Sequence, residues 1–478
     1  MYSNRAAVAA LTALAAASLA GCSLTPKGTN EERARLAETG KPYEPRFEDR
    51  VLPDLPPEPT WSEVLHRAFL ANGDLESAYF DWKAAVERID VAAAWPNSRL
   101  MLGYSYTLSA GNMKAFDRST FSFSPDSMES LLWPSKAAKQ GEVALAQARE
   151  AGARFRAAKF ELQRRVLSAW ADYAVQAERL RIARERELLA RFTLDTAGSR
   201  VRAGGIQQDL LKADVESEAA GDSVRTAEAN LAAARAMLNG LLGREPEAPL
   251  SAPELTPPPR PIPVDDAVLI ATAVEQNPEL EALAQRIQGR ADALERARLE
   301  WLPDINPMFA FTGSASQAVG AAVMLPTTIK EIEGGIKDAG AMLRGSEAVL
   351  RQARNDRAAS FVATLIALRD AERQAALFES RIVPAAERIV AITRQSYSAG
   401  GAAYLDMIGS ERALLDARLV VAEVRGMREK RLAELEALMG TDVETLASPM
   451  PSHAASPTPN HAPTASATAT VILQETRP

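Results

Sequence analysis

The chain of 478 residues holds a single cysteine, Cys22, and three histidines, His66, His453 and His461. One cysteine cannot form a disulfide framework, so the folded chain must be held together by packing. So few thiols and imidazoles, scattered along the sequence, make no metal site of the usual kinds. A Gly-rich phosphate loop and a nucleophile elbow are also missing from the sequence. These absences indicate a protein that is not an enzyme and that needs no cofactor or metal.

Basic residues are not in excess, and long apolar stretches are missing from the body of the chain. The formal net charge of −7 is spread along the sequence, so no basic patch for nucleic acid is present. Beyond the N-terminal apolar run, no stretch is long enough for a transmembrane helix, which needs about 18 apolar residues. Hydrophobic residues nevertheless make up 47% of the chain, which suffices for a large packed core.

The N-terminus carries the pattern of an export signal. Arg5 precedes an apolar run, Ala6–Ala20, that is typical of a signal peptide over residues 1–21. The run ends in Leu19-Ala20-Gly21-Cys22, which resembles the bacterial lipobox. That resemblance implies lipid attachment to Cys22 and, because Ser23 follows instead of an aspartate, sorting to the outer membrane. The alternative is an ordinary signal peptidase site at which the cysteine has no role.

Two similar turns organise the rest of the chain. Gly204-Gly205 and Gly400-Gly401 each follow an alanine, and each precedes an aspartate, Asp209 or Asp406, and then an apolar pair. Because glycine adopts positive φ without steric cost, each Gly-Gly predicts a tight reversal between two long helical patterns. A hairpin tip that occurs twice predicts a duplicated protein whose halves have equivalent structures.

Each half contains the same order of elements: a helix, a pair of strands, a very long helix, a tip and a shorter return helix. The halves are assigned to residues 61–245 and 265–445, joined by a Pro-rich connector at 246–264. Residues 22–60 predict an extended, lipid-anchored leader that carries the anchor away from the body, and residues 446–478 predict a disordered tail. Helices are expected at 61–94, 136–202, 206–242, 265–301 and 330–397, and from the second tip to 440.

Between these helices the hydrophobic period changes to two. Large apolar residues alternate with small or polar ones over 100–108, 121–124, 308–312 and 319–325, which predicts two pairs of strands with one large apolar face. A strand that crosses a membrane needs about 9–11 residues, and the first of these stretches just reaches that length. From the alternation alone, a small soluble sheet that caps a coiled coil is an equal alternative.

The helix expected at 136–202 has an alanine-rich heptad seam, which allows neighbouring helices to approach closely. At 1.5 Å per residue, a helix of this length is about 100 Å long. A compact globular domain does not accommodate such a helix, so the sequence predicts an elongated molecule.

The lipobox, the two tips and the repeated order of elements resemble the TolC-like outer membrane factor family. Further motifs are Leu132-Trp133-Pro134 before the first long helix and Leu325-Pro326 before the second, and the resemblance covers about Pro59 to Gly440. It implies a mostly α fold with a small β part. Duplicated long helical hairpins would form a trimeric α-barrel, and two short β-hairpins per chain would contribute to a twelve-stranded membrane β-barrel.

The same resemblance implies a function. The chain would be the outer-membrane channel component of a tripartite efflux pump or a type I secretion system, and would act as a passive exit duct. Its partners would be two further copies in a homotrimer, a periplasmic adaptor (membrane fusion) protein, an inner-membrane pump reached through that adaptor, and outer membrane lipid. It would be lipid-anchored in the cell outer membrane and extend into the periplasm. The alternative is a non-conducting periplasmic coiled-coil structural lipoprotein, which would not need the alternating strands.

The resemblance also implies roles for single residues. Gly204-Gly205 and Gly400-Gly401 would form the tips that dock the adaptor, although turn chemistry alone also explains them. Asp406 would point inward and form a ring of three carboxylates at the periplasmic constriction, with Arg412 able to compensate the charge. Asp209 is assigned to the same constriction. For both aspartates the alternative is a first-turn carboxylate that stabilises the helix dipole.

Overall fold

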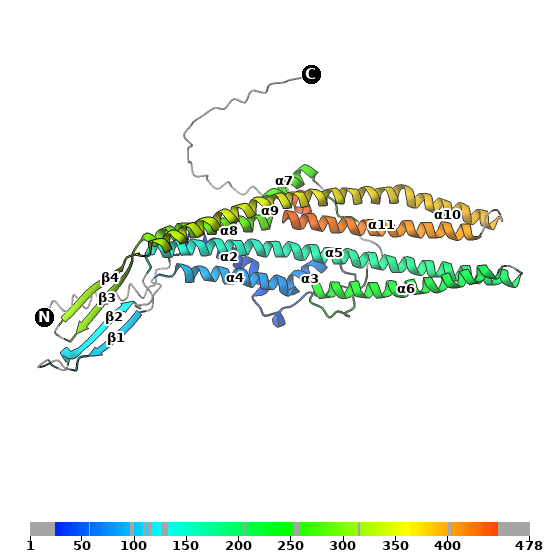
Figure 1. Cartoon of the computed structure of the whole chain (residues 1–478). Coiled ribbons are helices and arrows are strands. Elements are labelled where there is room, and N and C mark those ends of the chain that lie inside the picture. Colours follow the sequence, from blue (N-terminus) through cyan, green and yellow to red (C-terminus); the bar gives the residue numbers. More distant parts are fainter. Residues whose placement is uncertain are drawn as a thin grey trace, which may run out of the picture.

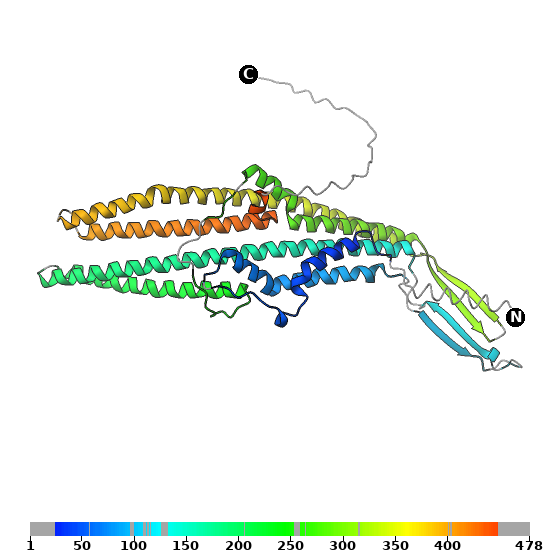
Figure 2. The ribbon, with the colours of Figure 1, turned by 180° about the vertical axis from the view of Figure 1, so that it is seen from behind.

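The computed structural model describes residues 24–447, except for short gaps at 57, 96–99, 109–110, 112–113, 115, 126–131, 205, 253–258, 263, 314–315, 400 and 402–403. The described molecule is elongated, with a β-sheet at one end and two helical hairpins that reach the other end (Figure 1). The view from behind shows the same arrangement, with the two hairpin tips together at the end opposite the sheet (Figure 2). Cys22, Gly205 and Gly400 lie outside the described residues.

Both halves have the same order of elements, and the expected mostly α fold with a small β part is confirmed. The first half contains α3 (Trp61–Ala71), α4 (Gly73–Ala93), β1 (Leu100–Tyr106), β2 (Ser119–Pro125), α5 (Pro134–Arg202) and α6 (Gln207–Leu241). The second contains α7 (Asp266–Gln276), α8 (Pro278–Arg298), β3 (Asp304–Thr312), β4 (Ser316–Met324), α9 (Ile329–Leu377), α10 (Val383–Ser398) and α11 (Tyr404–Met439). A π-helical turn, Phe378–Ile382, joins α9 to α10. None of the helices in the described part of the chain is both long and apolar enough to cross a membrane.

The first helix of each half is in fact two helices, so the single helices expected at 61–94 and 265–301 were wrong. Asn72 ends α3 and caps α4, with its side-chain oxygen 3.2 Å from the backbone nitrogen of Leu75. Asn277 does the same for α8, where Oδ1 lies 2.9 Å from the backbone nitrogen of Leu280. An asparagine side chain that accepts from the third residue onward starts a new helix, because it satisfies an otherwise unpaired N–H.

The return helices α6 and α11 end beside the junctions between α3 and α4 and between α7 and α8. In the second half the Nδ2 of Asn277 donates to the Leu438 carbonyl at 2.6 Å, so α11 and α8 meet end to end along α9. Gly440 has φ +71°, and a Cβ there would lie 2.4 Å from Cδ of Pro278. In the first half Gly243, with φ +60°, packs on Ala71 in the same way. Both glycines are therefore required by close approach as well as by left-handed backbone.

The leader is also different from the expectation. Residues Thr29–Gly40 form helix α2, followed by 3-10 turns at Lys41–Tyr43 and Phe47–Asp49, so an extended leader was wrong for this part. The Nε1 of Trp82 donates to the buried Glu32 carboxylate at 2.9 Å, and the ring of Tyr43 stacks on that of Tyr79 at 5.0 Å. The backbone nitrogen of Leu24 donates to the Ala93 carbonyl at the end of α4. The leader therefore starts near the sheet and packs on the body, because its few apolar side chains find partners there.

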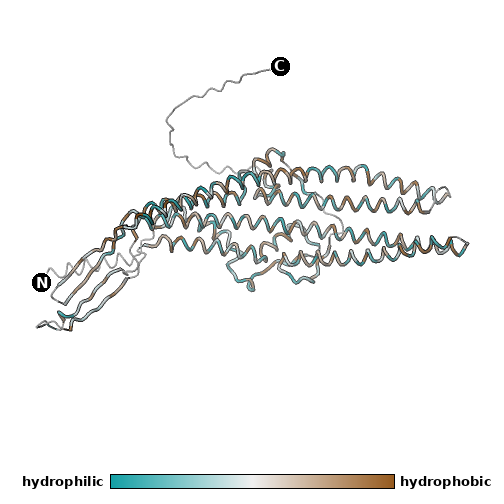
Figure 3. Tube along the Cα trace, in the orientation of Figure 1, coloured by the Kyte–Doolittle hydropathy of each residue, from teal (hydrophilic) through white to brown (hydrophobic). Residues whose placement is uncertain are grey.

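Each half has its own core, a cluster of buried hydrophobic side chains. The larger one packs α3, α4, α5 and α6 around aromatic residues such as Tyr79, Trp82 and Phe155. The smaller one packs α7, α9 and α11 around Leu368 and Leu435. Figure 3 shows that hydrophobic residues recur along every long helix instead of gathering in one segment. In α5 the buried residues recur from Lys136 to Thr193, as the heptad seam expected at 136–202 predicts.

The strands form one sheet in the order β1-β2-β3-β4, with each neighbouring pair antiparallel. β1 ends at Tyr106, so the stretch 100–108 was predicted two residues too long. The register places Tyr104 opposite Phe121, Phe121 opposite Phe311, and Phe309 opposite Val319. Residues opposite one another in a sheet share a face, so large apolar side chains cover one face across all four strands. The other face carries small and polar residues such as Gly103, Ser122 and Ala310, which lie opposite one another on β1, β2 and β3.

Candidate docking tips and channel entrance

The first tip lies between α5 and α6. Gly204 has φ +92°, and its N–H donates to the Val201 carbonyl at 3.0 Å. A Cβ at this position would meet nothing within 4 Å, so there is room for a side chain. The positive φ angle nevertheless disfavours any residue other than glycine. A β-branched residue here is strained by its φ angle alone.

The second tip ends α10 with different backbone geometry. The N–H of Gly401 donates to the Ser396 carbonyl at 2.8 Å, a bond across five residues that is typical of a helix C-terminal cap. Gly401 is outside the left-handed region, and a Cβ there would lie at an ordinary 3.6 Å from that carbonyl oxygen. The conformational requirement for glycine is therefore visible at Gly204 and not at Gly401.

The apolar pairs that follow the two tips are also not equivalent. Met407 and Ile408 are buried against Leu189 of α5, so the second tip is held to the first hairpin. The corresponding pair of the first hairpin is Leu210-Leu211, in which Leu210 is half-buried and Leu211 is 58% exposed. The duplicated sequence therefore gives one tip with its apolar pair covered and one with an apolar residue open to a partner.

Asp406 and Asp209 occupy the first turns of α11 and α6, and both are exposed. Within the described part of the chain, Asp406 has no ion-pair partner. Arg412, the expected compensating residue, instead pairs with Glu216 of α6. The structure thus leaves the Asp406 carboxylate available for a ring, while its place in a first helical turn keeps the helix-dipole role open as well.

A row of ion pairs joins the hairpins between the tips and the middle of the molecule. Arg179 of α5 pairs with Glu423 of α11 at 2.7 Å, and one heptad further toward the tips Arg186 pairs with Asp416. One heptad in the other direction, Asp172 pairs with Lys430. The partners lie far apart in the sequence, so the charge pattern of either helix alone could not have identified them.

The middle of the molecule holds a buried charge cluster. Arg260 of the connector donates to both carboxylate oxygens of Glu436, at 3.0 and 3.1 Å, and Glu436 is completely buried. Arg260 also contacts Glu429 and lies over the ring of Trp61. Burial raises the pKa of the Glu436 carboxyl, and the charge of Arg260 opposes that rise. The cluster ties the connector to α3 and α11, and sequence analysis had given no role to any of its members.

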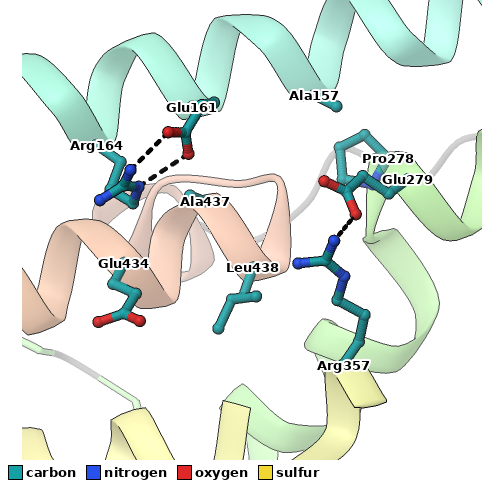
Figure 4. A pocket seen from close by; sticks show the side chains of 9 residues that line it. All are labelled: Ala157, Glu161, Arg164, Pro278, Glu279, Arg357, Glu434, Ala437 and Leu438. Carbon is teal, nitrogen blue, oxygen red and sulfur yellow. Dashed lines mark hydrogen bonds and ion pairs between the residues drawn. The ribbon is translucent and has the colours of Figure 1, made fainter. Parts of the chain in front are cut away.

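A cleft of about 160 Å³ lies near the junction of α11 and α8 (Figure 4). Four of its charged side chains form two pairs: Arg164 donates to Glu161, and Arg357 pairs with Glu279. The fifth, Glu434, pairs with Arg431, which is not part of the lining. Pairs of this kind leave little charge for a ligand. Over the described ranges, no group of three or more His, Cys, Asp or Glu residues could hold a metal ion.

Residues 64–244 match the family model described as Outer membrane efflux protein. No curated protein matches the sequence. Among solved structures, the outer-membrane channel OprN has 17% identity and a TM-score of 0.67, covering 80% of this chain and 90% of that one. A membrane protein from Pseudomonas aeruginosa has 18% identity and a TM-score of 0.68, with 80% and 90% covered. The outer membrane protein VceC from Vibrio cholerae has 16% identity and a TM-score of 0.66, with 80% and 96% covered.

Proposed function

We propose that this chain, which carries an outer membrane efflux protein domain and has the fold of the TolC-like outer-membrane channels, is the outer-membrane component of a tripartite efflux pump or a type I secretion system. It would act as a passive exit duct in the cell outer membrane and extend into the periplasm. The residues that carry this role are those of the sheet face, the tips and the first turn of α11.

The apolar face of the sheet is the observation that supports the proposal most directly. Leu102 is 80% exposed, and Tyr104, Phe121 and Val319 on the same face are also exposed. A soluble sheet that caps a coiled coil would bury such a face, because a contiguous exposed apolar patch favours a lipid or protein partner. A face of small and polar side chains opposite it suits a water-filled interior. Four strands from each of three chains would close one transmembrane sheet.

The helical part would cross the periplasm. The 69 residues of α5 correspond to about 100 Å of helix, and α9 and α10 run alongside over a similar distance. The two tips lie together at the far end (Figure 2). This distance from the sheet is what a duct needs to meet an adaptor that rises from the inner membrane, and the adaptor would dock on the tips.

Lipid attachment at Cys22 fits the position of the leader. The backbone N–H of Leu24 donates a hydrogen bond to the end of α4, beside the sheet. Cys22 lies two residues before Leu24, and two residues span at most about 7 Å of extended chain. An acyl chain on Cys22 would therefore enter the same membrane surface as the strands. The anchor and the sheet would act together, which differs from a leader that holds the anchor away from the body.

Asp406 is proposed as the selective residue of the entrance. It is exposed and unpaired among the described residues, and threefold symmetry would bring three such carboxylates around one axis. Gly409 follows one turn later, so a second acidic ring does not form at that position. For Asp209, which has the same first-turn place in α6, we propose the helix-dipole role instead of a place in the constriction.

Conductance of the purified protein in a planar lipid bilayer tests the channel. Stepwise conductance changes with a fixed unit size are expected. Protein that inserts as trimers and gives no steps would favour the non-conducting structural lipoprotein. The control is the same preparation after heat unfolding, which must give no conductance steps.

A further inference from the structure

Helix α7 lies on the outside of the second hairpin and is apolar on both its inner and its outer side (Figure 1, Figure 2). On the inner side, Leu269 and Ala273 are buried in the cluster shared with α9 and α11. The exposed apolar residues of its outer face are Ala267, Val268, Ile270 and Ala271. Val268 is 47% exposed and Ile270 is 41% exposed. Because a helix that is apolar on all sides is normally buried, the outer face of α7 indicates a partner.

The equivalent helix of the first half, α3, does not have such a face. Both helices have 11 residues, and each is followed by an asparagine that caps the next helix. Counted from that asparagine, polar residues of α3 stand where the outer face of α7 is apolar: Ser62 for Ala267, Glu63 for Val268 and His66 for Ala271. The duplicated fold therefore does not itself require apolar residues at these positions.

The remaining apolar residues on this side of α3 are covered by the leader. Leu65, which corresponds to Ile270, is buried in the same cluster as Tyr43 of the leader. The Tyr43 hydroxyl donates to the Phe69 carbonyl of α3 at 3.0 Å. In the second half, the residues before α7 that pack on a core, Ile262 and Val264, contact the inner cluster instead. Over the described residues, the outer face of α7 thus has no counterpart of the leader.

The segment that follows α11 leaves the body beside α7. Val443 belongs to the same buried cluster as Leu269, and Leu446 packs against that cluster. Residues 448–470 are rich in Pro, Ala, Ser and Thr, and their one large apolar residue is Met450. Three consecutive large apolar residues come next, Val471-Ile472-Leu473. A Pro-rich spacer followed by an apolar triad has the composition of a tethered docking peptide.

The spacer is long enough to bring this triad back to α7. A flexible chain of the length of residues 448–470 has a root-mean-square end-to-end distance of about 25 Å. The 11 residues of α7 form a helix about 16 Å long, which lies where the spacer begins. Tethering over such a distance gives the triad an effective concentration of about 1 mM at the outer face. Even a weak contact would therefore be formed most of the time.

We propose that Val471-Ile472-Leu473 docks on the outer face of α7 in the same chain. The triad would cover Val268 and Ile270, as the leader covers the corresponding side of α3. Each half would then have a covering segment from outside its own repeat, the leader for the first half and residues 471–473 for the second. The contact needs no ion flow, so it is independent of the proposed channel function.

Cysteine reactivity tests this contact. Ala271→Cys places a thiol in the outer face of α7, and His66→Cys places one at the corresponding exposed position of α3. Each substitution is made in the full chain together with Cys22→Ala, so that the new thiol is the only one. The rate of reaction with a maleimide-linked poly(ethylene glycol) is measured on the purified protein. It is divided by the rate for the same variant unfolded in urea, which corrects for the local reactivity of the thiol.

The Ala271→Cys variant should react more slowly than the His66→Cys variant. With a dissociation constant of about 0.1 mM and an effective concentration of about 1 mM, the expected difference is about tenfold. Combining Val471→Ser, Ile472→Ser and Leu473→Ser should remove this difference. Gln474→Ser with Thr476→Ser is the matched control, because it alters the same segment and keeps the triad, and it should leave the protection unchanged.

Equal rates of the Ala271→Cys and His66→Cys variants would overturn the proposal. Slow labelling that persists without the triad would show that a second copy or another protein covers α7, and would overturn it as well. Docking between chains is tested by co-assembly of the triad-free Ala271→Cys chain with a cysteine-free chain that keeps the triad. Fast labelling is expected there, and protection would mean that the segment of a neighbouring copy docks instead.

Discussion

Lys136 at the start of α5 is buried against Asp304 of β3, with its Nζ 3.1 Å from Oδ1 of the carboxylate. The same oxygen accepts from the backbone nitrogen of Trp133, and Glu300 lies 3.3 Å from the same ammonium. This pair joins the first long helix to the second pair of strands. It therefore fixes the joint between the helical part and the sheet with one residue from each half.

Lys136→Met should destabilise this joint. Removal of the lysine leaves the largely covered carboxylate of Asp304 without its charged partner, which costs up to about 3–5 kcal/mol. Thermal unfolding of the purified protein measures the loss. Lys337→Met is the matched control, because that lysine pairs with Glu333 at the surface and an exposed pair contributes about 0–1 kcal/mol. Equal effects of the two substitutions would show that burial of the pair does not matter.

Cys22→Ala should prevent lipid attachment and impair sorting to the outer membrane more than folding. The sheet and the helices do not contain Cys22, so their packing is unaffected. Metabolic labelling with a clickable palmitate analogue should mark the wild type and leave the variant unlabelled. Circular dichroism of both proteins controls for folding. Equal labelling would contradict the lipobox.

Gly204→Val should abolish export and leave a folded trimer. At φ +92° a β-branched residue costs about 1–3 kcal/mol locally and forces the tip to rearrange, which spoils the surface that the adaptor would meet. Accumulation of an efflux dye in cells that express the chain measures export. Gly240→Val, at an exposed helical glycine with open space around it, is the control. Normal export by the Gly204 variant would rule out this tip as the docking surface.

Asp406→Asn should lower cation selectivity and relieve block by divalent or trivalent cations, because three carboxylates at one axis attract cations and exclude anions. A weakening of block by about tenfold corresponds to roughly 1.4 kcal/mol. Single-channel recordings under a salt gradient measure both properties. Asp209→Asn should change neither, since a first-turn role in α6 does not need the pore. If selectivity and block are the same in the Asp406 variant as in the wild type, the ring does not exist.

Glu436 should make stability depend on pH in a defined direction. Burial raises the pKa of its carboxyl above 4.5, so the folded protein binds a proton there more tightly than the unfolded chain does. The contribution of this group to stability is therefore largest below the unfolded value and declines as pH rises through the folded one. Glu436→Gln should remove this decline in thermal unfolding between pH 4 and 8. Glu434→Gln, a surface residue paired with Arg431, should retain it.

Local patterns determined much of this protein in advance. The heptad seam, the strands and the two Gly-Gly tips are properties of neighbouring residues, because hydrophobic period and backbone freedom act over a few positions. The alternation of large and small residues at 100–108 predicted the apolar face of β1, although it overestimated the strand by two residues. The resemblance to a family then supplied the order in which these elements assemble.

Tertiary structure decided which polar residues have partners. Asn72 and Asn277 were expected inside helices, but each side chain accepts from the N–H three residues further on and caps a new helix. Asn277 also donates to the Leu438 carbonyl near the end of α11, a contact that no local pattern indicated. Arg260 and Glu436, like Lys136 and Asp304, lie far apart in the sequence, and no period of two or of 3.6 connects them. A buried charge is tolerated only next to its partner, and that partner is defined by packing between elements. The sequence by itself therefore determined the helices, strands and turns, and the tertiary structure determined the joints between them.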